Sequence, residues 1–347
     1  MRINRLSLRN YRCFEGIDLE FKSRVNIISG NNGSGITTIL DAMSTILSIF
    51  TSSLNPRVKE TRIKQRDIRT VLAGNEAVLA YCLPAEISMD LSIDGSNAIW
   101  KMIRRSKTGK NTVLGADKLL EYVKMCERGM GSEIVLPLVA YYSSHRPPVF
   151  RKRKSFHPKN FFVDGYRSSL KQDNINQWVP FWIEREAKRS IDDGETNHRY
   201  DVMKAIIFQT IGAIRNQSGS QTLFGHDVKS YFAWLDIMNP DKNGIRWLNE
   251  LCEGERTAVS VALDMACRMS VLNPHLNENI MRETPGVVLV DEPEQHLSHL
   301  SCVKFIQCLA NSFPKVQFII CSHVNKESLK RDAGGTENLF FTNINEI

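Results

Sequence analysis

A glycine-rich turn between an apolar strand and a helix lies near the start of the chain, in residues 25–38 (VNIISGNNGSGITT), and few folds accommodate it. Gly30 and Gly35 have the spacing of a phosphate-binding loop, and Thr37 stands at the hydroxyl position of such a loop. Ile36 occupies the position at which the loop usually has lysine. The stretch therefore predicts a strand, a phosphate loop and a helix, with the cation of the loop missing.

Each part of this loop has its own physical role. Glycines let the backbone come close to a ligand, so that successive N–H groups converge on phosphate oxygens at the start of the helix. The Thr37 hydroxyl would bind Mg²⁺, whereas the missing lysine would have contributed roughly 1.5–3 kcal/mol at the β- and γ-phosphates. We expect nucleotide binding to weaken and turnover to suffer more. The predicted binding residues are Gly30, Asn31, Asn32, Gly33, Ser34, Gly35, Ile36, Thr37 and Thr38.

Two interpretations of Ile36 are open: a natural loss of hydrolysis, or an introduced substitution that traps the nucleotide-bound state. A chance glycine-rich turn is the plain alternative to the whole loop, because short motifs also match by accident. The elements further along the chain argue against that alternative.

The composition is that of a folded protein, since 42% of the 347 residues are hydrophobic and 24% are charged. A chain of this length can bury a full core, either as one large domain with lobes or as two intimate domains. We predict a single domain with an N-terminal lobe (1–110), a mainly helical insert (111–250) and a C-terminal lobe (251–347).

Membrane and secretion signals are not evident in the sequence. No apolar run approaches the roughly 18 residues of a membrane span, and the N-terminus lacks an apolar signal core. The eight cysteines are scattered without a Cys-x-x-Cys pair, which indicates reduced thiols rather than a disulfide framework or a zinc site. We therefore expect a cytoplasmic protein that binds no membrane.

Alternating and helical apolar patterns predict the other elements. In chain order we expect a hairpin over 2–28, a helix over 37–50, a peripheral loop over 51–69, antiparallel strands over 76–104, a helix over 116–127, a strand over 134–142 and mostly helix over 162–235, with Trp178, Trp182 and Trp234 as packing anchors.

The net charge of +7 favours an acidic partner without identifying one. The strongest charge run, residues 151–159 (RKRKSFHPK), contains five Lys or Arg residues. It could contact nucleic-acid phosphates, but a solvated loop after Pro147 and Pro148 is the favoured interpretation.

Two predicted apolar strands further along the chain end in polar side chains that could bind a metal ion, water or phosphate. Residues 286–292 (GVVLVDE) end in Asp291, which would hold Mg²⁺, often through water, and Glu292, which would orient or deprotonate the attacking water. Residues 316–323 (VQFIICSH) end in His323, which would meet a γ-phosphate. A solvated turn and a structural histidine are the plain alternatives.

A helix is predicted between these two parts of the chain. In residues 251–270, Gly254 and Glu255 open a helix whose apolar positions Val259, Ala262, Leu263 and Ala266 give it one buried face. We interpret its N-terminus as a ready anion site.

These elements together resemble the ABC-type ATPases of the SMC, RecF and OLD group, within the broader AAA-type class. INRLSLRNYRCF is similar to that group's first strand and adenine-side loop, GNNGSGITT to its Walker A, LCEGE to its signature, VVLVDEPEQHL to its Walker B and D-loop, and CSH to its switch histidine. A nearer similarity is to compact bacterial ATPases described as predicted ATP-binding proteins involved in virulence, and to relatives in retron and Septu-like phage-defence systems. The segments that carry this similarity are LVAYYSSHR, GERTAVSVALDMACRMSVLNP and DEPEQHLSHL.

The resemblance implies an α/β fold, a P-loop NTPase head of the ABC type with an antiparallel β lobe and a helical lobe. No heptad pattern persists, so no long coiled coil is expected. ATP and Mg²⁺ are the implied cofactors, with Thr37 and Asp291 on the metal and Glu292 and His323 as catalytic residues. The signature residues Cys252, Gly254 and Glu255 would close over nucleotide held by a second chain, and Cys252 replaces the usual serine with a weaker donor.

The function implied is a nucleotide-dependent switch that forms a homodimer or higher homo-oligomer through ATP-sandwich heads. In a bacterial anti-phage defence module it would control a separate effector, a nuclease or toxin. One alternative is a nucleotide-bound scaffold that does not hydrolyse ATP. Another is a DNA-repair ATPase that binds DNA through residues 151–159.

Overall fold

The computed structural model describes residues 1–73, 78–93, 95–128, 134–144, 163–170, 198–214, 222–223, 226–227, 252–295, 297–323 and 339–346. The basic run 151–159, the three tryptophans predicted as anchors and most of the region 162–235 lie outside these residues.

One of the two main sheets is antiparallel, with strand order β2-β1-β6-β7-β8. Its strands are β1 Arg2–Tyr11, β2 Phe14–Glu20, β6 Ala85–Ile93, β7 Ser96–Arg104 and β8 Thr112–Leu114. Buried and half-buried residues alternate along β6, because successive side chains point to opposite faces of a strand. The predicted hairpin and antiparallel strands are thus confirmed.

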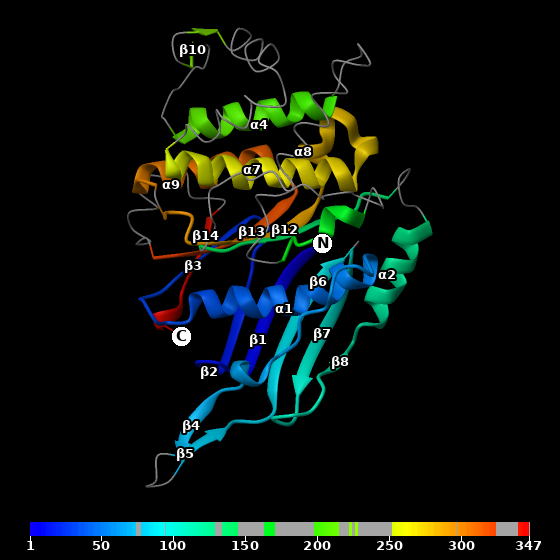
Figure 1. Ribbon diagram of the computed structural model, residues 1–347, viewed down its shortest axis with the longest axis vertical. Helices are drawn as coiled ribbons and strands as arrows, with labels where there is room; N and C mark the ends of the chain where they lie inside the picture. Colours follow the sequence, from blue (N-terminus) through cyan, green and yellow to red (C-terminus); the bar gives the residue numbers. More distant parts are fainter. Residues whose placement is uncertain are drawn as a thin grey trace, which may run out of the picture.

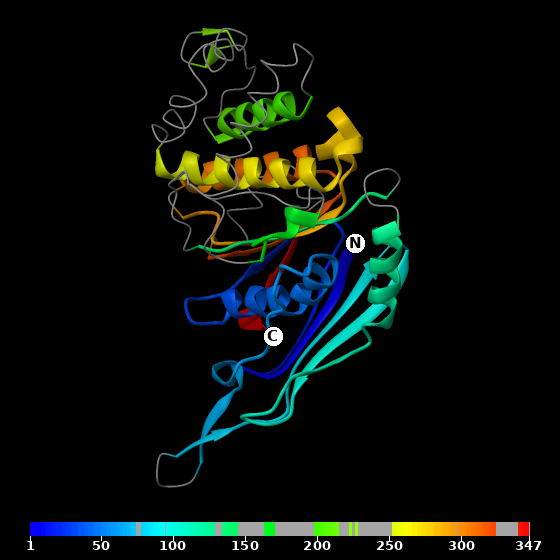
Figure 2. The same cartoon turned by 45° about the vertical axis from the view of Figure 1, so that its right-hand side comes forward.

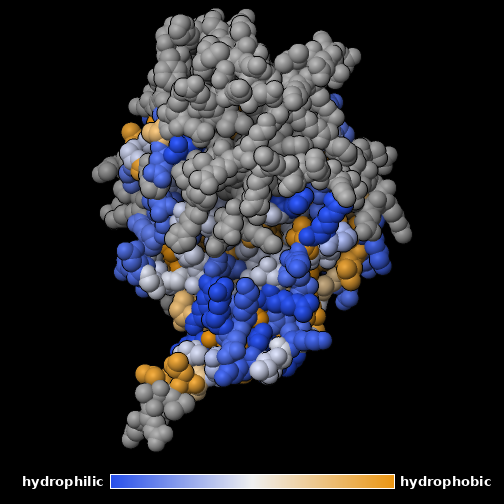
Figure 3. Space-filling view, in the orientation of Figure 1, coloured by the Kyte–Doolittle hydropathy of each residue, from blue (hydrophilic) through white to orange (hydrophobic). Residues whose placement is uncertain are grey.

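A separate hairpin projects from this end of the molecule (Figure 1). Its strands β4 Thr70–Ala73 and β5 Val78–Tyr81 pair with each other and place Leu72 opposite Leu79. The two leucines are 72% and 61% exposed, and they form part of the hydrophobic surface on the projecting arm (Figure 3).

The second main sheet is parallel, with strand order β14-β3-β13-β12-β9. Its strands are β3 Val25–Ser29, β9 Leu138–Tyr142, β12 Gly286–Asp291, β13 Val316–Ser322 and β14 Leu339–Asn343. Every residue of β9, β12 and β13 is buried, as expected for a parallel sheet covered on both faces. The strand predicted over 134–142 is shorter than expected, because it begins after Pro137, which has no N–H to donate to a ladder.

Helix α1 Ile36–Leu54 lies between the two sheets and contacts strands of both (Figures 1 and 2). In the part of the chain that the structure describes, α1 alone is long and apolar enough to cross a membrane by length and composition, and 72% of its most apolar window is buried inside the molecule. The prediction that no run approaches a membrane span was therefore too strict. The burial is that of a core helix.

Helices α7 Glu253–Leu272 and α9 His299–Ser312 lie on the other face of the parallel sheet, and α4 His198–Ile214 lies over both (Figure 1). Because α7 is covered from two sides, every residue from Ala258 to its end is buried, and the prediction of a single buried face was wrong. The remaining helices are α2 Asp117–Arg128, α8 Ile280–Glu283 and the 3₁₀ turns η1 Gln65–Asp67, η2 Val163–Tyr166, η3 Pro274–Asn279 and η4 Ile344–Glu346.

Two further expectations need correction, and a third stays untested. Residues 51–54 belong to α1 rather than to a peripheral loop, and Asp67 in that loop is buried. A strand pair, β10 Thr222–Leu223 with β11 His226–Asp227, occurs in the region predicted as mostly helical. The lobe boundaries stay a prediction, although β8 pairs with β7 across residue 110 and β9 joins the sheet of the C-terminal strands.

Candidate nucleotide site

The parallel register brings the predicted site residues to one edge of the sheet. Ser29, at the end of β3, pairs with Ser322 on β13, and Asp291, at the end of β12, pairs with Cys321. The phosphate loop, the acidic pair and His323 follow these three strands directly. Their convergence is the consequence of strands that run in the same direction, whose carboxyl ends share a crevice.

The loop has the backbone of an anion cradle. Gly35 caps α1 with φ of 90°, in the left-handed region, and a Cβ there would lie 2.6 Å from Cys13 Sγ in the β1–β2 turn. The first turn of α1 contains no acidic residue of its own and has no side-chain cap, which leaves its N–H groups available to an anion. The Ser34 hydroxyl is buried and bonds to no described residue. These features fit a bound phosphate group.

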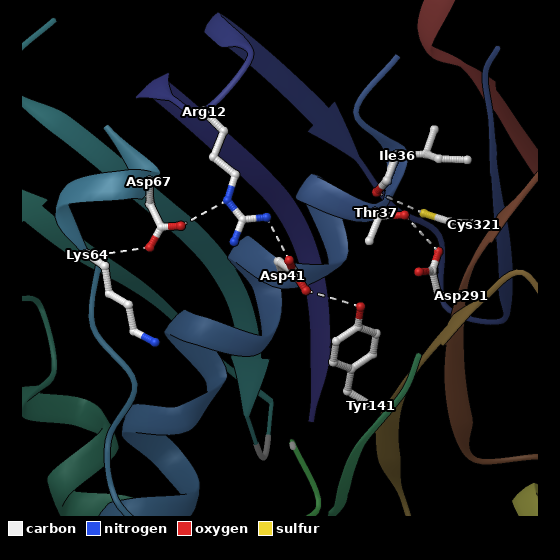
Figure 4. A network of polar contacts seen from close by, with 9 residues as sticks. All are labelled: Arg12, Ile36, Thr37, Asp41, Lys64, Asp67, Tyr141, Asp291 and Cys321. Atoms are coloured by element: carbon white, nitrogen blue, oxygen red, sulfur yellow. Dashed lines mark hydrogen bonds and ion pairs between the residues drawn. The ribbon is translucent and has the colours of Figure 1, made fainter. Parts of the chain in front are cut away.

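The metal side of the site is assembled. The Thr37 hydroxyl donates to Asp291 Oδ1 over 3.3 Å, which joins the first turn of α1 to the end of β12 (Figure 4). A hydroxyl and a carboxylate from these positions are the oxygen ligands that Mg²⁺ prefers. The residues present therefore fit the metal that the sequence predicted.

Ile36 is built into the core beneath the loop. Its residue is 3% exposed, and a Cβ on Gly30 would lie 3.1 Å from its Cγ2 atom. The Cys321 thiol donates to the Ile36 carbonyl over 3.2 Å (Figure 4). Burial raises the pKa of that thiol well above its usual value, with Asp291 adding to the effect, so the thiol is neutral and able to donate. The position of the usual lysine is thus filled by an apolar side chain.

His323 links the loop to the acidic pair. Its Nδ1 atom lies 2.9 Å from the Gly30 carbonyl and its Nε2 atom lies 3.2 Å from Glu292 Oε1. The Gly30 oxygen only accepts, so Nδ1 carries a hydrogen in this arrangement. Glu292 has φ of 45°, an unusual backbone conformation at the strand end, and Glu294 accepts from the His323 backbone N–H. The predicted catalytic pair is in mutual contact.

Helix α7, which begins at the signature residues, lies on the opposite face of the parallel sheet from α1 (Figure 1). Cys252 is exposed at the cap of α7, whereas Gly254 and Glu255 are buried. Glu253 and Glu255 both lie in the first turn. Both carboxylates lie where they complement the helix dipole, and the anion site at this N-terminus stays a prediction.

A polar network next to the loop was missed from the sequence. Arg12, in the β1–β2 turn, pairs with Asp41 on α1 over 2.6 Å and with Asp67 of η1 over 2.9 Å, and the Tyr141 hydroxyl donates to Asp41 over 3.1 Å (Figure 4). Burial raises the pKa of Tyr141, which keeps its hydroxyl neutral. The sequence feature that could have indicated this network is Asp41, which lies one helical turn after Thr37 on the same face of the predicted helix.

A second missed group fixes α7. Arg268 and Asp264 form a fully buried ion pair of 2.7 Å, and Asp264 also accepts from the Tyr142 hydroxyl over 2.8 Å. Arg268 donates to the Gly165 carbonyl over 2.7 Å. Charged residues four apart on an apolar helix were the signal for this pair. The group holds the signature helix against β9 and η2.

A parallel sheet that gathers a phosphate loop and an acidic pair, joined through α1 to an antiparallel sheet, is the architecture of an ABC-type ATPase head, and the predicted fold class is confirmed. A solved Smc head, bound to the C-winged helix domain of ScpA, has this fold with a TM-score of 0.51 and 12% identity, over 95% of this chain and 92% of that one. The chain belongs to the AAA_23 family, whose AAA domain matches residues 5–190.

Curated relatives carry the nearer similarity that the sequence motifs indicated. The "Retron Vc95 probable ATPase" of Vibrio cholerae is 23% identical over 369 residues, which cover 93% of this chain and 70% of that protein. The "Septu protein PtuA" of Bacillus mycoides is 25% identical over 168 residues, covering 48% and 21%. The resemblance to ABC-type ATPases of retron and Septu systems is confirmed.

Proposed function

We propose that this protein is a nucleotide-dependent switch, whose heads dimerise around ATP and Mg²⁺ and so control a separate effector in a bacterial anti-phage defence module. The likeness to a retron ATPase and to a Septu protein supports the defence setting. The effector would be a nuclease or toxin, and the compartment would be the cytoplasm.

The observation that carries the proposal is the placement of α1 and α7 on opposite faces of the parallel sheet (Figure 1). The phosphate loop, the Thr37–Asp291 contact and the His323–Glu292 contact lie at one sheet edge. The signature helix α7 lies across the sheet from α1 (Figure 2). This placement supports a model in which the signature of one chain meets the phosphate loop of another.

Each chain's residues have a defined task in this proposal. The N–H groups of the loop bind the phosphates, Thr37 and Asp291 hold Mg²⁺, and Glu292 orients or deprotonates water, with His323 positioned against it. Mg²⁺ supplies charge neutralisation at the phosphates when it is bound. The Cys252–Glu255 segment of a second chain would complete the donor shell around the γ-phosphate.

Gly254 offers a direct test. Gly254→Arg places a bulky side chain at the start of α7, and Gly254→Ala is the matched control. We expect Gly254→Arg to reduce ATP-dependent dimerisation in mass photometry, while the affinity of a fluorescent nucleotide for the isolated chain is unchanged. The alanine variant should dimerise. Dimerisation with ATP that persists in a folded Gly254→Arg protein would contradict the sandwich.

A second candidate function is a nucleotide-bound scaffold that does not turn over ATP, and the buried Ile36 favours it. Phosphate release by the native chain and by Ile36→Lys separates the two. A switch driven by hydrolysis releases phosphate measurably in the native chain, whereas a scaffold that arose by loss of the lysine releases none in the native chain. Nucleic-acid contact through residues 151–159 stays a prediction, and salt-dependent DNA binding tests it.

A further inference from the structure

A cavity of about 550 Å³ is lined by residues of α4, η3, α8 and α9. These helices lie on the other face of the parallel sheet from α1 (Figure 1). Its size falls within the roughly 300–1,000 Å³ of small-molecule sites. The walls are part polar and part apolar, and their polar residues include Gln209, Glu278, Arg282, Lys304 and Gln307. None of these residues belongs to the nucleotide site.

The charges in the wall favour an anion. Among the described residues that line the cavity, Arg282 and Lys304 are cations and Glu278 is the one carboxylate. Arg282 forms no ion pair with any residue that the structure describes, and the carboxylate next to it in sequence, Glu283, is already paired with Lys315. A guanidinium presents several donors in a fixed plane, which suits carboxylate and phosphate groups.

Neutral donors add to these cations. The Ser312 hydroxyl, which also lines the cavity, donates to Gln209 Oε1 over 2.8 Å. That bond fixes which end of the Gln209 amide accepts, and it leaves the NH₂ end as a donor. A hydrogen bond from this NH₂ group to an anionic ligand would be charge-assisted, and such bonds are stronger than bonds between two neutral groups.

A glycine keeps one wall open. Gly212 lies in the last turns of α4 and lines the cavity, and a Cβ added there would meet no atom within 4 Å. Glycine inside a helix is less stable than alanine, so a glycine with free space around it is not explained by packing. Its effect is to leave the space in front of α4 empty.

We propose that this cavity binds a small polyanion with phosphate or carboxylate groups, at a site separate from the phosphate loop. Helix α4, which lines the cavity, packs on the signature helix α7. The proposal does not depend on the proposed function, since it requires neither ATP binding nor dimerisation.

Inorganic pyrophosphate and citrate are suitable probes, titrated calorimetrically into the full-length protein. We expect at least one of them to bind, and Arg282→Glu to weaken binding by roughly tenfold or more, because a charge-assisted contact becomes a repulsion. Gly212→Phe should abolish binding by filling the cavity. Gly212→Ala, with little added volume, is the matched control and should retain it.

The phosphate loop is the competing site for both probes, and Gly35→Ala identifies it. Binding that is lost in Gly35→Ala but kept in Arg282→Glu and Gly212→Phe would overturn the proposal, as would the failure of both probes to bind. Arg282 is exposed, so its substitution remains informative if Gly212→Phe does not fold.

Discussion

Helices α1 and α7 both begin at a site residue, yet their first turns differ in charge. The first turn of α1 is free of acidic residues and follows a glycine with positive φ, whereas the first turn of α7 contains Glu253 and Glu255. Both lack a side-chain hydrogen bond at the cap. An N-terminus attracts anions through its unpaired N–H groups and its dipole, and carboxylates in the first turn oppose that attraction.

This difference in charge shows that the N-termini of α1 and α7 cannot play the same part in binding a phosphate group. The N-terminus of α1 fits a phosphate within a single chain, and the contact between Thr37 and Asp291 fits a metal beside it. α7 carries its own negative charge, so it would approach a γ-phosphate only where a metal and a loop have already neutralised that group. This order of events agrees with nucleotide binding first and head closure second.

The largest expected effect is at the metal. Asp291→Asn should lower Mg²⁺-dependent nucleotide affinity by roughly 10- to 100-fold, the usual cost of losing a group that orients a metal. Glu292→Gln should keep the affinity and abolish residual hydrolysis. Fluorescent-nucleotide titration with Mg²⁺ and with EDTA, followed by phosphate release, measures both. If the two variants behaved alike, the division of roles would be wrong.

The next effect concerns the cap of α1. Gly35→Ala forces a side chain into a left-handed conformation, at a cost of about 1–2 kcal/mol, and pushes it against Cys13 and Phe14. We expect lower stability and weaker nucleotide binding. Gly95→Ala is the matched control, because Gly95 also has positive φ but no atom within 4 Å of an added Cβ. Gly95→Ala should lower the melting temperature without changing nucleotide affinity. If both variants bound nucleotide with equal affinity, the loop around Gly35 would not be the phosphate-binding site.

The smallest effect is at the start of α7. Glu253→Gln removes a charge that complements the helix dipole, so the free energy of unfolding should fall by about 0.3–1 kcal/mol. Association should move in the opposite direction, because one repulsion toward the γ-phosphate of the other chain is lost. Urea unfolding and ATP-dependent mass photometry give the two values. A dimer weakened by this change would reverse the charge argument drawn from the comparison.

The sequence predicted the parts of the fold that have strong local patterns. The apolar runs of β3, β12 and β13 and the glycine turn before α1 stood out, because a buried parallel strand needs continuous apolar residues. Their convergence followed from strand direction alone. β14 was missed, since a short segment near the chain end has no periodicity to distinguish it.

The polar contacts around the site could not be predicted in the same way. Arg12 meets Asp67 across 55 positions of the chain, and Arg268 reaches the Gly165 carbonyl across 103. Such pairings depend on the tertiary arrangement and leave no local spacing to detect. Ile36 shows the opposite case, because its departure from the motif was plain in the sequence while its burial in the core was visible only in the structure.

The central claim is that the cradle of α1 still binds ATP with Mg²⁺ although the cation at position 36 is gone. Equilibrium binding and steady-state phosphate release, measured on one preparation of the native chain, test it most directly. The account predicts saturable, Mg²⁺-dependent ATP binding with very slow turnover. Turnover of about 1 s⁻¹, the low end for working enzymes, would contradict it, as would the absence of any ATP binding.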